Sequence, residues 1–377
     1  MSAIPLKPRS SDGPIKTSIL GTGMSLSVFH QPSISRLPDH FVLHSIYERT
    51  PKGRLDPLIE SGKLQGVKVV RSLEEVLEDT EVELVVVSTP NNTHYEYAKR
   101  CLNSGKHVLI EKPICPTYAE AQELYSLAED KGLILGVYQN RRWDSDFLTL
   151  RKLLDSNTLG KITELTSSFD RYRPLPSTYT PGTNWKETPG ESNNAIYNLG
   201  SHLIDQAVVL FGKPEKVQGR VWDSRGIGMD ENFEVNLFYP SKTITLKASI
   251  VSASPHQLRF LVKGTKGTYT KYTLPSSHPS LKKFDSPVDH EGFDSEPEEG
   301  WGTMWVAKEE RDGTDFIEEK VPAISGNYKA LYENLYESIN SGDRSKLSVK
   351  SEQVLTVLKI IELARKSSEQ GRVLPFE

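Results

Sequence analysis

Hydrophobic positions in the first third of the chain fall into short runs, and segments with helical periodicity separate these runs. Short continuous apolar runs are typical of strands that are buried on both faces of a sheet. Six such strands are predicted, at Ile15–Leu20, Phe41–Tyr47, Val67–Val70, Glu83–Ser88, His107–Ile110 and Leu133–Val137. Strands that alternate with single helices predict a parallel sheet with right-handed crossovers.

The ends of the intervening helices carry capping signals. A Ser or Thr followed three residues later by Glu predicts a capping box, in which both side chains bond to backbone N–H groups. A glycine just after a helix predicts the residue that ends it. We predict capping boxes at Ser72, Thr93 and Thr117, and terminating glycines at Gly62, Gly105 and Gly132.

Beyond Gln139 the runs alternate between apolar and polar residues, which is typical of an antiparallel sheet with one solvated face. The predicted strands are Ile162–Asp170, Lys216–Trp222, Glu234–Tyr239, Thr243–Ser252 and Gln257–Lys263. Helices are predicted at residues 144–155, 199–211, 326–341 and 348–368. We expect the acidic segment 276–300 to be a solvated loop.

The length of 377 residues fits two domains, because one domain usually has about 100–200 residues. We expect a flexible arm at residues 1–13, an α/β domain at 14–140, and a second domain at 141–377 that includes the C-terminal helices.

Composition excludes several classes of protein. The formal net charge of −4 argues against binding to nucleic acid. Cys101 and Cys115 belong to no Cys/His cluster, so we expect no metal site and no disulfide framework. The sequence has neither the apolar core of a signal peptide nor a membrane-spanning run, so we expect a cytoplasmic protein without membrane association.

A glycine-rich turn follows the first strand, in the segment Gly21-Thr-Gly23-Met24-Ser25-Leu26. The two glycines let the backbone turn tightly and approach a pyrophosphate, and the following helix N-terminus supplies N–H groups. Leu26 replaces the third glycine of the G-x-G-x-x-G pattern, which serves close packing of helix and strand. In a β-α-β context this turn predicts a Rossmann domain that binds NAD or NADP, with Gly21, Gly23, Met24 and Ser25 contacting the cofactor.

The second strand ends at Glu48-Arg49, about where such domains contact the adenosine ribose. A carboxylate there accepts ribose hydroxyls and favours NAD, whereas an arginine can pair with the 2′-phosphate of NADP. Glu48 would repel that phosphate, so these two residues favour NAD slightly. An ordinary solvated strand end is the alternative.

Two further strand ends carry polar groups. The fourth strand leads into Thr89-Pro90-Asn91-Asn92-Thr93-His94, and the fifth leads into Glu111-Lys112-Pro113. Ligands of open α/β sheets lie beyond the carboxyl ends of the strands. We therefore predict further cofactor contacts from Thr89, Pro90, Asn91, His94, Glu111 and Lys112.

Together, the GxG turn, TPNNTH, EKP and Gly200-Ser201-His202-Leu-Ile-Asp205 resemble the glucose–fructose oxidoreductase, inositol dehydrogenase and MocA (Gfo/Idh/MocA) family. The resemblance extends from about Ile15 to Val373. The segments YQNRRWD, DRYRP and GSHLIDQ are similar to the branch that contains NADP-dependent scyllo-inositol dehydrogenases, which weakens the preference for NAD. The resemblance to the family implies an α/β Rossmann domain plus an α+β domain with a large, open, mainly antiparallel sheet. It also implies a homodimer or homotetramer.

The resemblance further assigns the catalytic lysine to Lys112 and the catalytic histidine to His202. Oxidation of a secondary alcohol needs a base for the hydroxyl proton, and the cofactor takes the hydride. A lysine stabilises a developing alkoxide, and a histidine exchanges protons near neutral pH. Asp205 either orients or charge-balances His202 or has a structural role, and the sequence does not separate these alternatives.

The active-site segment departs from the family in two places. The family has Asp four residues before the histidine, where this chain has Asn198, and glycines where it has Ser192-Asn193-Asn194-Ala195. In an α-helix the i, i+4 spacing would place Asn198 and His202 on one face. Asparagine forms hydrogen bonds but takes no proton, so altered, slowed or lost catalysis follows as a hypothesis.

Aromatic and hydrogen-bonding side chains suit a small polyhydroxylated substrate. Candidate contacts are Arg141, Arg142, Trp143, Tyr172, Arg173, Asn184, Trp185, Asn198 and His202. The leading hypothesis is an NAD(P)-dependent oxidoreductase acting on a secondary hydroxyl or ketone of a polyol, inositol or sugar. The alternatives are a catalytically weakened cofactor-binding regulator or partner protein, and an aldehyde or imine reductase.

Overall fold

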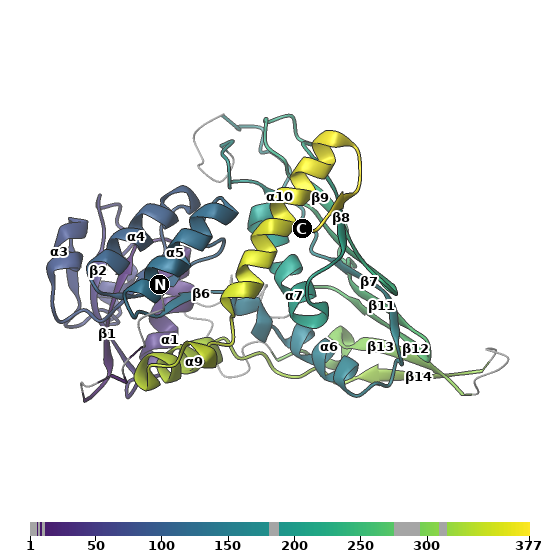
Figure 1. Ribbon diagram of the computed structural model, residues 1–377, viewed down its shortest axis with the longest axis horizontal. Helices are drawn as coiled ribbons and strands as arrows, with labels where there is room; N and C mark the ends of the chain where they lie inside the picture. Colours follow the sequence, from purple (N-terminus) through teal and green to yellow (C-terminus); the bar gives the residue numbers. More distant parts are fainter. Residues whose placement is uncertain (1–5, 7, 10–11, 181–187, 275–294, 309–314) are drawn as a thin grey trace. The chain divides into compact units, whose positions relative to one another are not determined.

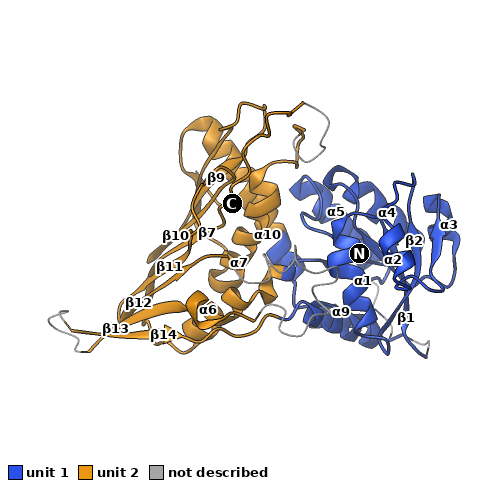
Figure 2. Ribbon diagram, turned by 180° about the vertical axis from the view of Figure 1, so that it is seen from behind, with its two compact units in different colours: residues 1–140, 279–293, 327–354 blue, residues 141–278, 294–326, 355–377 orange. Residues whose placement is uncertain are grey.

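The computed structural model of the protein describes residues 6, 8–9, 12–180, 188–274, 295–308 and 315–377. The chain divides into two compact units (Figure 2). The described part of the first unit comes from residues 1–140 and 327–354. The described part of the second unit comes from residues 141–278, 294–326 and 355–377. Among the described residues, no helix is long and apolar enough to cross a membrane.

The first unit is built on a six-stranded sheet in the order β3-β2-β1-β4-β5-β6, with every neighbouring pair parallel. Its strands are β1 Ile15–Leu20, β2 Phe41–Tyr47, β3 Lys68–Val70, β4 Leu84–Val87, β5 His107–Ile110 and β6 Leu135–Val137. The order reverses between β1 and β4, which is the point where open α/β sheets bind ligands. The predicted Rossmann domain is confirmed.

Helices cover both faces of this sheet, with α4 and α5 on one face and α1 and α9 on the other (Figure 1). They are α1 Gln31–Ser35, α2 Asp56–Glu60, α3 Leu73–Glu78, α4 His94–Asn103, α5 Tyr118–Asp130 and α9 Lys329–Ser341. We expected α9 in the second domain, but it belongs to the first unit, where Leu335 lies against Gly136 of β6. We expected residues 1–13 to be flexible, but Arg9 is held in place, because its guanidinium donates hydrogen bonds to both carboxylate oxygens of Glu83.

The second unit contains a nine-stranded sheet in the order β14-β13-β12-β11-β7-β10-β9-β8-β15. Only the β7–β10 pair is parallel. The strands are β7 Ile162–Ser168, β8 Lys216–Trp222, β9 Asn232–Tyr239, β10 Lys242–Ser249, β11 Leu258–Gly264, β12 Gly267–Tyr272, β13 Gly302–Ala307, β14 Phe316–Val321 and β15 Leu374–Pro375. This is the mainly antiparallel sheet that we expected.

Three helices, α6 Ser145–Asp155, α7 Ser201–Phe211 and α10 Ser351–Gln370, lie on one face of that sheet (Figure 1). The helix α10 approaches β8 so closely that a Cβ atom at Gly219 would collide with the backbone of Ala364. Hydroxyls of Ser367 and Ser368 accept hydrogen bonds from backbone N–H groups of β8. The C-terminal helix therefore supplies partners for the part of β8 that the short strand β15 does not reach.

Two of the three predicted capping boxes are confirmed, at Ser72 and Thr117. The prediction at Thr93 is wrong, because its hydroxyl bonds instead to Thr89 Oγ1 and to the carbonyl of Pro90, both at 2.7 Å. The three terminating glycines have the positive φ that the prediction requires. Strands β12 to β15 were not predicted. The acidic segment 276–300 lies mostly outside the described residues.

Candidate functional site

The loop after β1 has the geometry of a pyrophosphate-binding turn. Gly21 has φ +110°, and a Cβ atom there would collide with the carbonyl oxygen of Ser88, just after β4. At Gly23 a Cβ atom would meet nothing within 4 Å, so a ligand can approach the backbone. Gly21 therefore serves the close approach of β1 and β4, whereas Gly23 leaves space for a ligand.

The helix that follows this turn begins in an unusual way. Residues Leu26–His30 form a π-helical turn, η1, before α1, and Met24 is exposed. Leu26, which stands in place of the third glycine, is 1% exposed. A π-helical turn is wider than an α-helical one and often occurs at functional sites. We infer that the wider turn accommodates Leu26 where the usual pattern needs glycine.

At the end of β2, Glu48 is buried and held by one partner. Its Oε2 accepts a hydrogen bond from Arg71 Nη1 at 2.6 Å, whereas its Oε1 is buried and has no hydrogen-bond partner among the described residues. A buried carboxylate oxygen without a donor is costly, so a donor supplied by a ligand would stabilise it. A ribose hydroxyl is such a donor. Arg49 is exposed. Sequence reasoning did not single out Arg71, because no motif marks it.

The loop after β4 is fixed by His94, which we expected to contact the cofactor. The imidazole is fully buried, with Nδ1 2.7 Å from the carbonyl oxygen of Pro113 and Nε2 2.9 Å from that of Thr89. Burial lowers the pKa of His94, although the two carbonyls raise it in part. His94 therefore joins the loops after β4 and β5 and does not reach solvent. Pro90 and Asn91 lie in this loop, where Asn91–Thr93 forms a short 3-10 turn.

Lys112 follows β5 and is half-buried, between a buried Glu111 and a cis peptide bond to Pro113. One carboxylate oxygen of Glu111 lies 3.1 Å from His30 Nε2, and the other accepts the backbone N–H of Lys112 at 3.2 Å. The second ring nitrogen of His30 lies 2.8 Å from the hydroxyl of Tyr332 on α9. The carboxylate of Glu111 thus fixes the backbone of Lys112 through this hydrogen bond.

The charge of Glu111 is maintained despite its burial. Burial alone would raise its pKa, but the hydrogen bond from His30 and the charge of Lys112 outweigh that effect and lower it. An ionised carboxylate keeps both oxygens as acceptors for His30 and for the backbone of Lys112. His30 and Tyr332 are functional candidates that sequence reasoning missed, because 302 positions separate them.

These residues fit a dinucleotide cofactor. The carboxyl ends of β1, β2, β4 and β5 lie at one edge of the sheet, since the strands are parallel and neighbours pair in register. That edge contains the open backbone at Gly23, the buried acceptor at Glu48, and Lys112. Along the edge Glu48 comes after β2, Gly23 after β1 and Lys112 after β5, an order that suits the adenosine ribose, the pyrophosphate and the reactive ring in turn.

In the second unit, the candidate histidine lies at the start of α7. Residues Ile196–Gly200 form a second π-helical turn, η5, and His202 follows it with 7% of its surface exposed. The α-helix therefore begins only after Asn198, which lies in the π-helical turn, so the condition for an α-helical i, i+4 spacing between Asn198 and His202 is not met. Asn198 donates its backbone N–H to Asn194 at 2.9 Å, and its side-chain amide lies 3.4 Å from Asn193 Oδ1.

Asp205 forms a buried bidentate ion pair. Its two oxygens accept hydrogen bonds from Arg142 Nε at 2.8 Å and Nη2 at 2.6 Å. Arg142 belongs to the 3-10 turn η3, Asn140–Trp143, and Gln206 donates to the carbonyl of Arg141 in the same turn. The pair therefore attaches this turn to α7, which favours the structural alternative for Asp205.

The other predicted substrate contacts differ in accessibility. Arg141 is buried and pairs with Asp144 at 2.8 Å, Trp143 is half-buried, and Tyr172 is 61% exposed beside β10. Asn184 and Trp185 lie outside the described residues.

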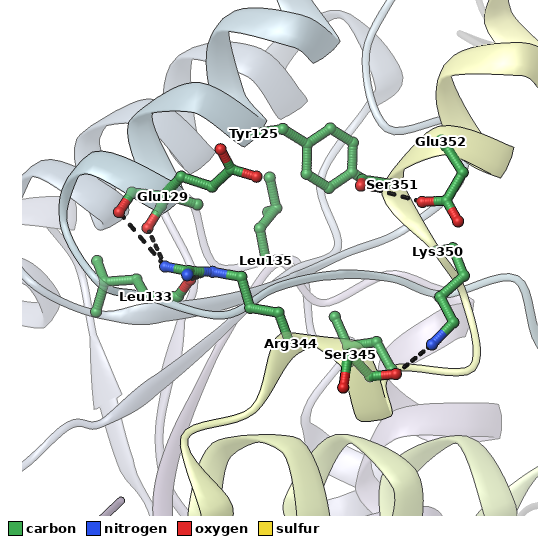
Figure 3. Close-up of a pocket in the computed structure, with 11 residues that line it drawn as sticks. Tyr125, Glu129, Leu133, Leu135, Arg344, Ser345, Lys350, Ser351 and Glu352 are labelled. Atoms are coloured by element: carbon green, nitrogen blue, oxygen red, sulfur yellow. Dashed lines mark hydrogen bonds between the residues drawn. The ribbon is translucent and has the colours of Figure 1, made fainter. Parts of the chain in front are cut away.

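A cavity of about 340 Å³ in the first unit contains none of the predicted site residues (Figure 3). It lies beside the start of β6 and the end of α5, so it faces the edge of the sheet opposite to the cofactor edge. Arg344 donates hydrogen bonds there to the carbonyls of Ala128 and Leu133. A cation at the end of a helix stabilises that end. We therefore assign these contacts a structural role.

Comparison with known proteins agrees with this geometry. Residues 15–139 match the model of an oxidoreductase family with an NAD-binding Rossmann fold, and residues 147–270 match the GFO/IDH/MocA C-terminal domain.

Three relatives span nearly the whole chain. An uncharacterized oxidoreductase of Schizosaccharomyces pombe, C115.03, is 40% identical over 95% of this chain and 98% of its own. The scyllo-inositol 2-dehydrogenase (NADP(+)) IolW of Bacillus subtilis is 34% identical over 99% of both chains. A crystal structure of an oxidoreductase from Bacillus cereus is 31% identical, with a TM-score of 0.84 over 96% of this chain and 99% of that one. The chain therefore belongs to the GFO/IDH/MocA family of NAD(P)-binding oxidoreductases.

Proposed function

We propose that this protein transfers a hydride between NAD(P) and a secondary hydroxyl or ketone of a polyol, inositol or sugar. The observation that carries the proposal is the position of Lys112, which a buried Glu111–His30 pair holds at the cofactor edge of the sheet. The relative that is named as a scyllo-inositol 2-dehydrogenase supports a polyhydroxylated substrate.

When bound, the nicotinamide accepts or supplies the hydride. The ammonium group of Lys112 stabilises negative charge on the substrate oxygen as its proton leaves. The neutral imidazole of His202 accepts that proton during oxidation and returns it during reduction, which suits a group that ordinarily titrates near pH 6.5. The Arg142–Asp205 pair holds the start of α7, and so the backbone that carries His202.

Asn198 supports a second candidate function, a cofactor-binding regulator with weakened catalysis. Its amide contacts Asn193, and it offers no group that could share a proton with Lys112 or His202. The variant Asn198→Asp separates the two functions. A gain of more than about tenfold in turnover would favour the second candidate, because the aspartate would restore catalysis that Asn198 has weakened. One added acid–base group contributes about 10²–10⁴-fold.

The proposal is tested by nicotinamide absorbance at 340 nm, with NAD or NADP and a panel of inositols, sugars, polyols and their acids. We expect turnover with at least one neutral or acidic polyhydroxylated compound. Lys112→Ala and His202→Ala should each lower it by at least about 100-fold. Cofactor binding without turnover on any compound would contradict the proposal and favour the regulator.

A further inference from the structure

We propose that Arg171 is a specificity-determining residue that binds a carboxylate on the substrate, so that the protein acts on polyhydroxy acids in preference to neutral polyols. The inference rests on the proposed function, since it names the substrate class of the same site. It is argued from contacts within the second unit.

Four largely buried arginines of this unit each have a carboxylate of their own. In every case a guanidinium nitrogen lies within hydrogen-bond distance of a carboxylate oxygen, as buried charges require. The pairs are Arg141–Asp144, Arg142–Asp205, Arg225–Glu231 and Arg259–Asp146. Each of these four cations therefore has a counter-charge beside it.

Arg171 differs from these four arginines. It is half-buried, its Nε is inaccessible to solvent, and that nitrogen has no hydrogen-bond partner among the described residues. No ion pair joins it to any described carboxylate. A buried guanidinium N–H without an acceptor is costly, and the charge of Arg171 is not compensated nearby. An oxyanion that reached the accessible part of this half-buried side chain would gain a charge-assisted interaction.

The position of Arg171 is well defined. Its backbone N–H donates to the carbonyl of Ser249 at 2.7 Å, and its own carbonyl accepts from Ser252 at 3.0 Å. Its guanidinium lies 5.1 Å from the ring centroid of Phe169, two residues earlier. Stacking on an aromatic ring orients a guanidinium and leaves its edge available for hydrogen bonds.

The surrounding charge also favours an anion. Burial lowers the pKa of the Arg171 guanidinium, and the positive charges of Arg173 and Arg141 lower it further. The guanidinium of Arg141 lies 4.8 Å from the same Phe169 ring. An added negative charge would relieve this repulsion between like charges.

This group of cations lies on the helix-covered side of the sheet, next to α7. Ser167 of β7, which points to the same side as Phe169, contacts Arg259, and Arg259 also reaches Gln206 of α7. The amide of Gln206 bonds to the carbonyl of Arg141, and His202 is one helical turn earlier. Contacts through Phe169, Arg259 and Gln206 therefore connect Arg171 to the helix that carries His202.

A carboxylate suits this position better than a phosphate. The four ion-paired arginines each have a carboxylate, whereas Arg171 has none among the described residues. The single positive charge of Arg171 is matched by the single negative charge of a carboxylate. A carboxylate also offers two coplanar oxygens to the planar fork of arginine.

The test compares acids with matched neutral compounds by isothermal titration calorimetry, in the presence of NADP or NAD. The probes are D-gluconate against D-glucitol, D-glucuronate against D-glucose, and D-glucitol 6-phosphate as the phosphate arm. The variant Arg171→Gln removes the charge. Arg151→Gln, at an exposed arginine on α6, is the matched control.

We expect at least one acid to bind at least about tenfold more tightly than its neutral counterpart, and this preference to disappear in Arg171→Gln but not in Arg151→Gln. Three results would overturn the inference: equal binding of acid and neutral compound, an unchanged preference in Arg171→Gln, or a preference for the phosphate. Binding of acids without hydride transfer would contradict only the proposed function. Turnover of neutral polyols without a preference for acids would contradict only this inference.

Discussion

The buried pair of Arg142 and Asp205 permits a quantitative prediction. Both side chains are almost inaccessible, at 5% and 2% exposure, and two hydrogen bonds join them. Removal of one partner from such a pair leaves an uncompensated charge and costs about 3–5 kcal/mol. Replacement of both partners by apolar residues of similar size is often nearly neutral. Arg142→Met and Asp205→Leu should therefore be far from additive.

The assay is urea unfolding at pH 7, followed by tryptophan fluorescence. All five tryptophans lie between residues 143 and 305, so the signal reports on the second unit. With a slope of about 3 kcal/mol per molar urea, each single variant should lower the midpoint by about 1–1.7 M. The double variant should lose less than either single variant.

Additive losses of stability in the double variant would refute this account of the pair. So would an Asp205→Asn variant that keeps its midpoint but loses turnover, because Asp205 would then act on His202 rather than on Arg142.

Three further predictions concern the first unit. Gly23→Ala should leave the melting temperature within about 1 °C but weaken NAD(P) binding by at least about tenfold, whereas Gly21→Ala should also lower stability, because its Cβ would collide with the backbone. Glu48→Ala should weaken NAD binding by about tenfold and NADP binding by less, as measured by calorimetry, because a ribose hydroxyl would lose its acceptor. The stability of this unit should fall by up to about 3 kcal/mol between pH 6.5 and 4, because burial lowers the pKa of His107 to about 4 and the unfolded chain binds a proton that the folded chain does not.

Each of these predictions has its own readout. Unfolding of the first unit can be followed with 4,4′-dithiodipyridine, because both cysteines are buried in it. His107→Asn retains an acceptor for the N–H of Ile134 and should flatten the pH profile, so an unchanged profile in that variant would contradict the assignment. A folded Gly23→Ala protein with wild-type affinity would show that the cofactor does not approach this backbone. Equal losses for both cofactors in Glu48→Ala would exclude recognition of the ribose hydroxyl.

The parallel sheet could be predicted because its strands are continuous apolar runs between polar helices. The bounds of β1, β2 and β5 agree with the predicted ones. Strands β12 to β14 were missed. The strand β14 reads FIEEKV and is exposed along nearly its whole length at the edge of the sheet, so it lacks the alternation of a half-buried strand.

Local signals predicted the site only in part. The glycines after β1 and the residues after β5 follow strand ends, and a strand end can be read from periodicity. The support for Lys112 could not be predicted, since His30 and Tyr332 meet only when α9 returns to the first unit. The Thr93 prediction failed because its hydroxyl, which could cap a helix, bonds instead to Thr89 and to the carbonyl of Pro90 in its own loop.

The proposed function assigns Lys112 and His202 to the same substrate oxygen, whose charge the lysine stabilises and whose proton the histidine exchanges. The most direct test measures kcat at saturating cofactor for the wild type, Lys112→Ala, His202→Ala and the double variant. Groups that act as a unit are strongly non-additive, so the double variant should be no more than a few-fold slower than the slower single variant. Losses that multiply in the double variant, or a single variant with wild-type kcat, would contradict the claim.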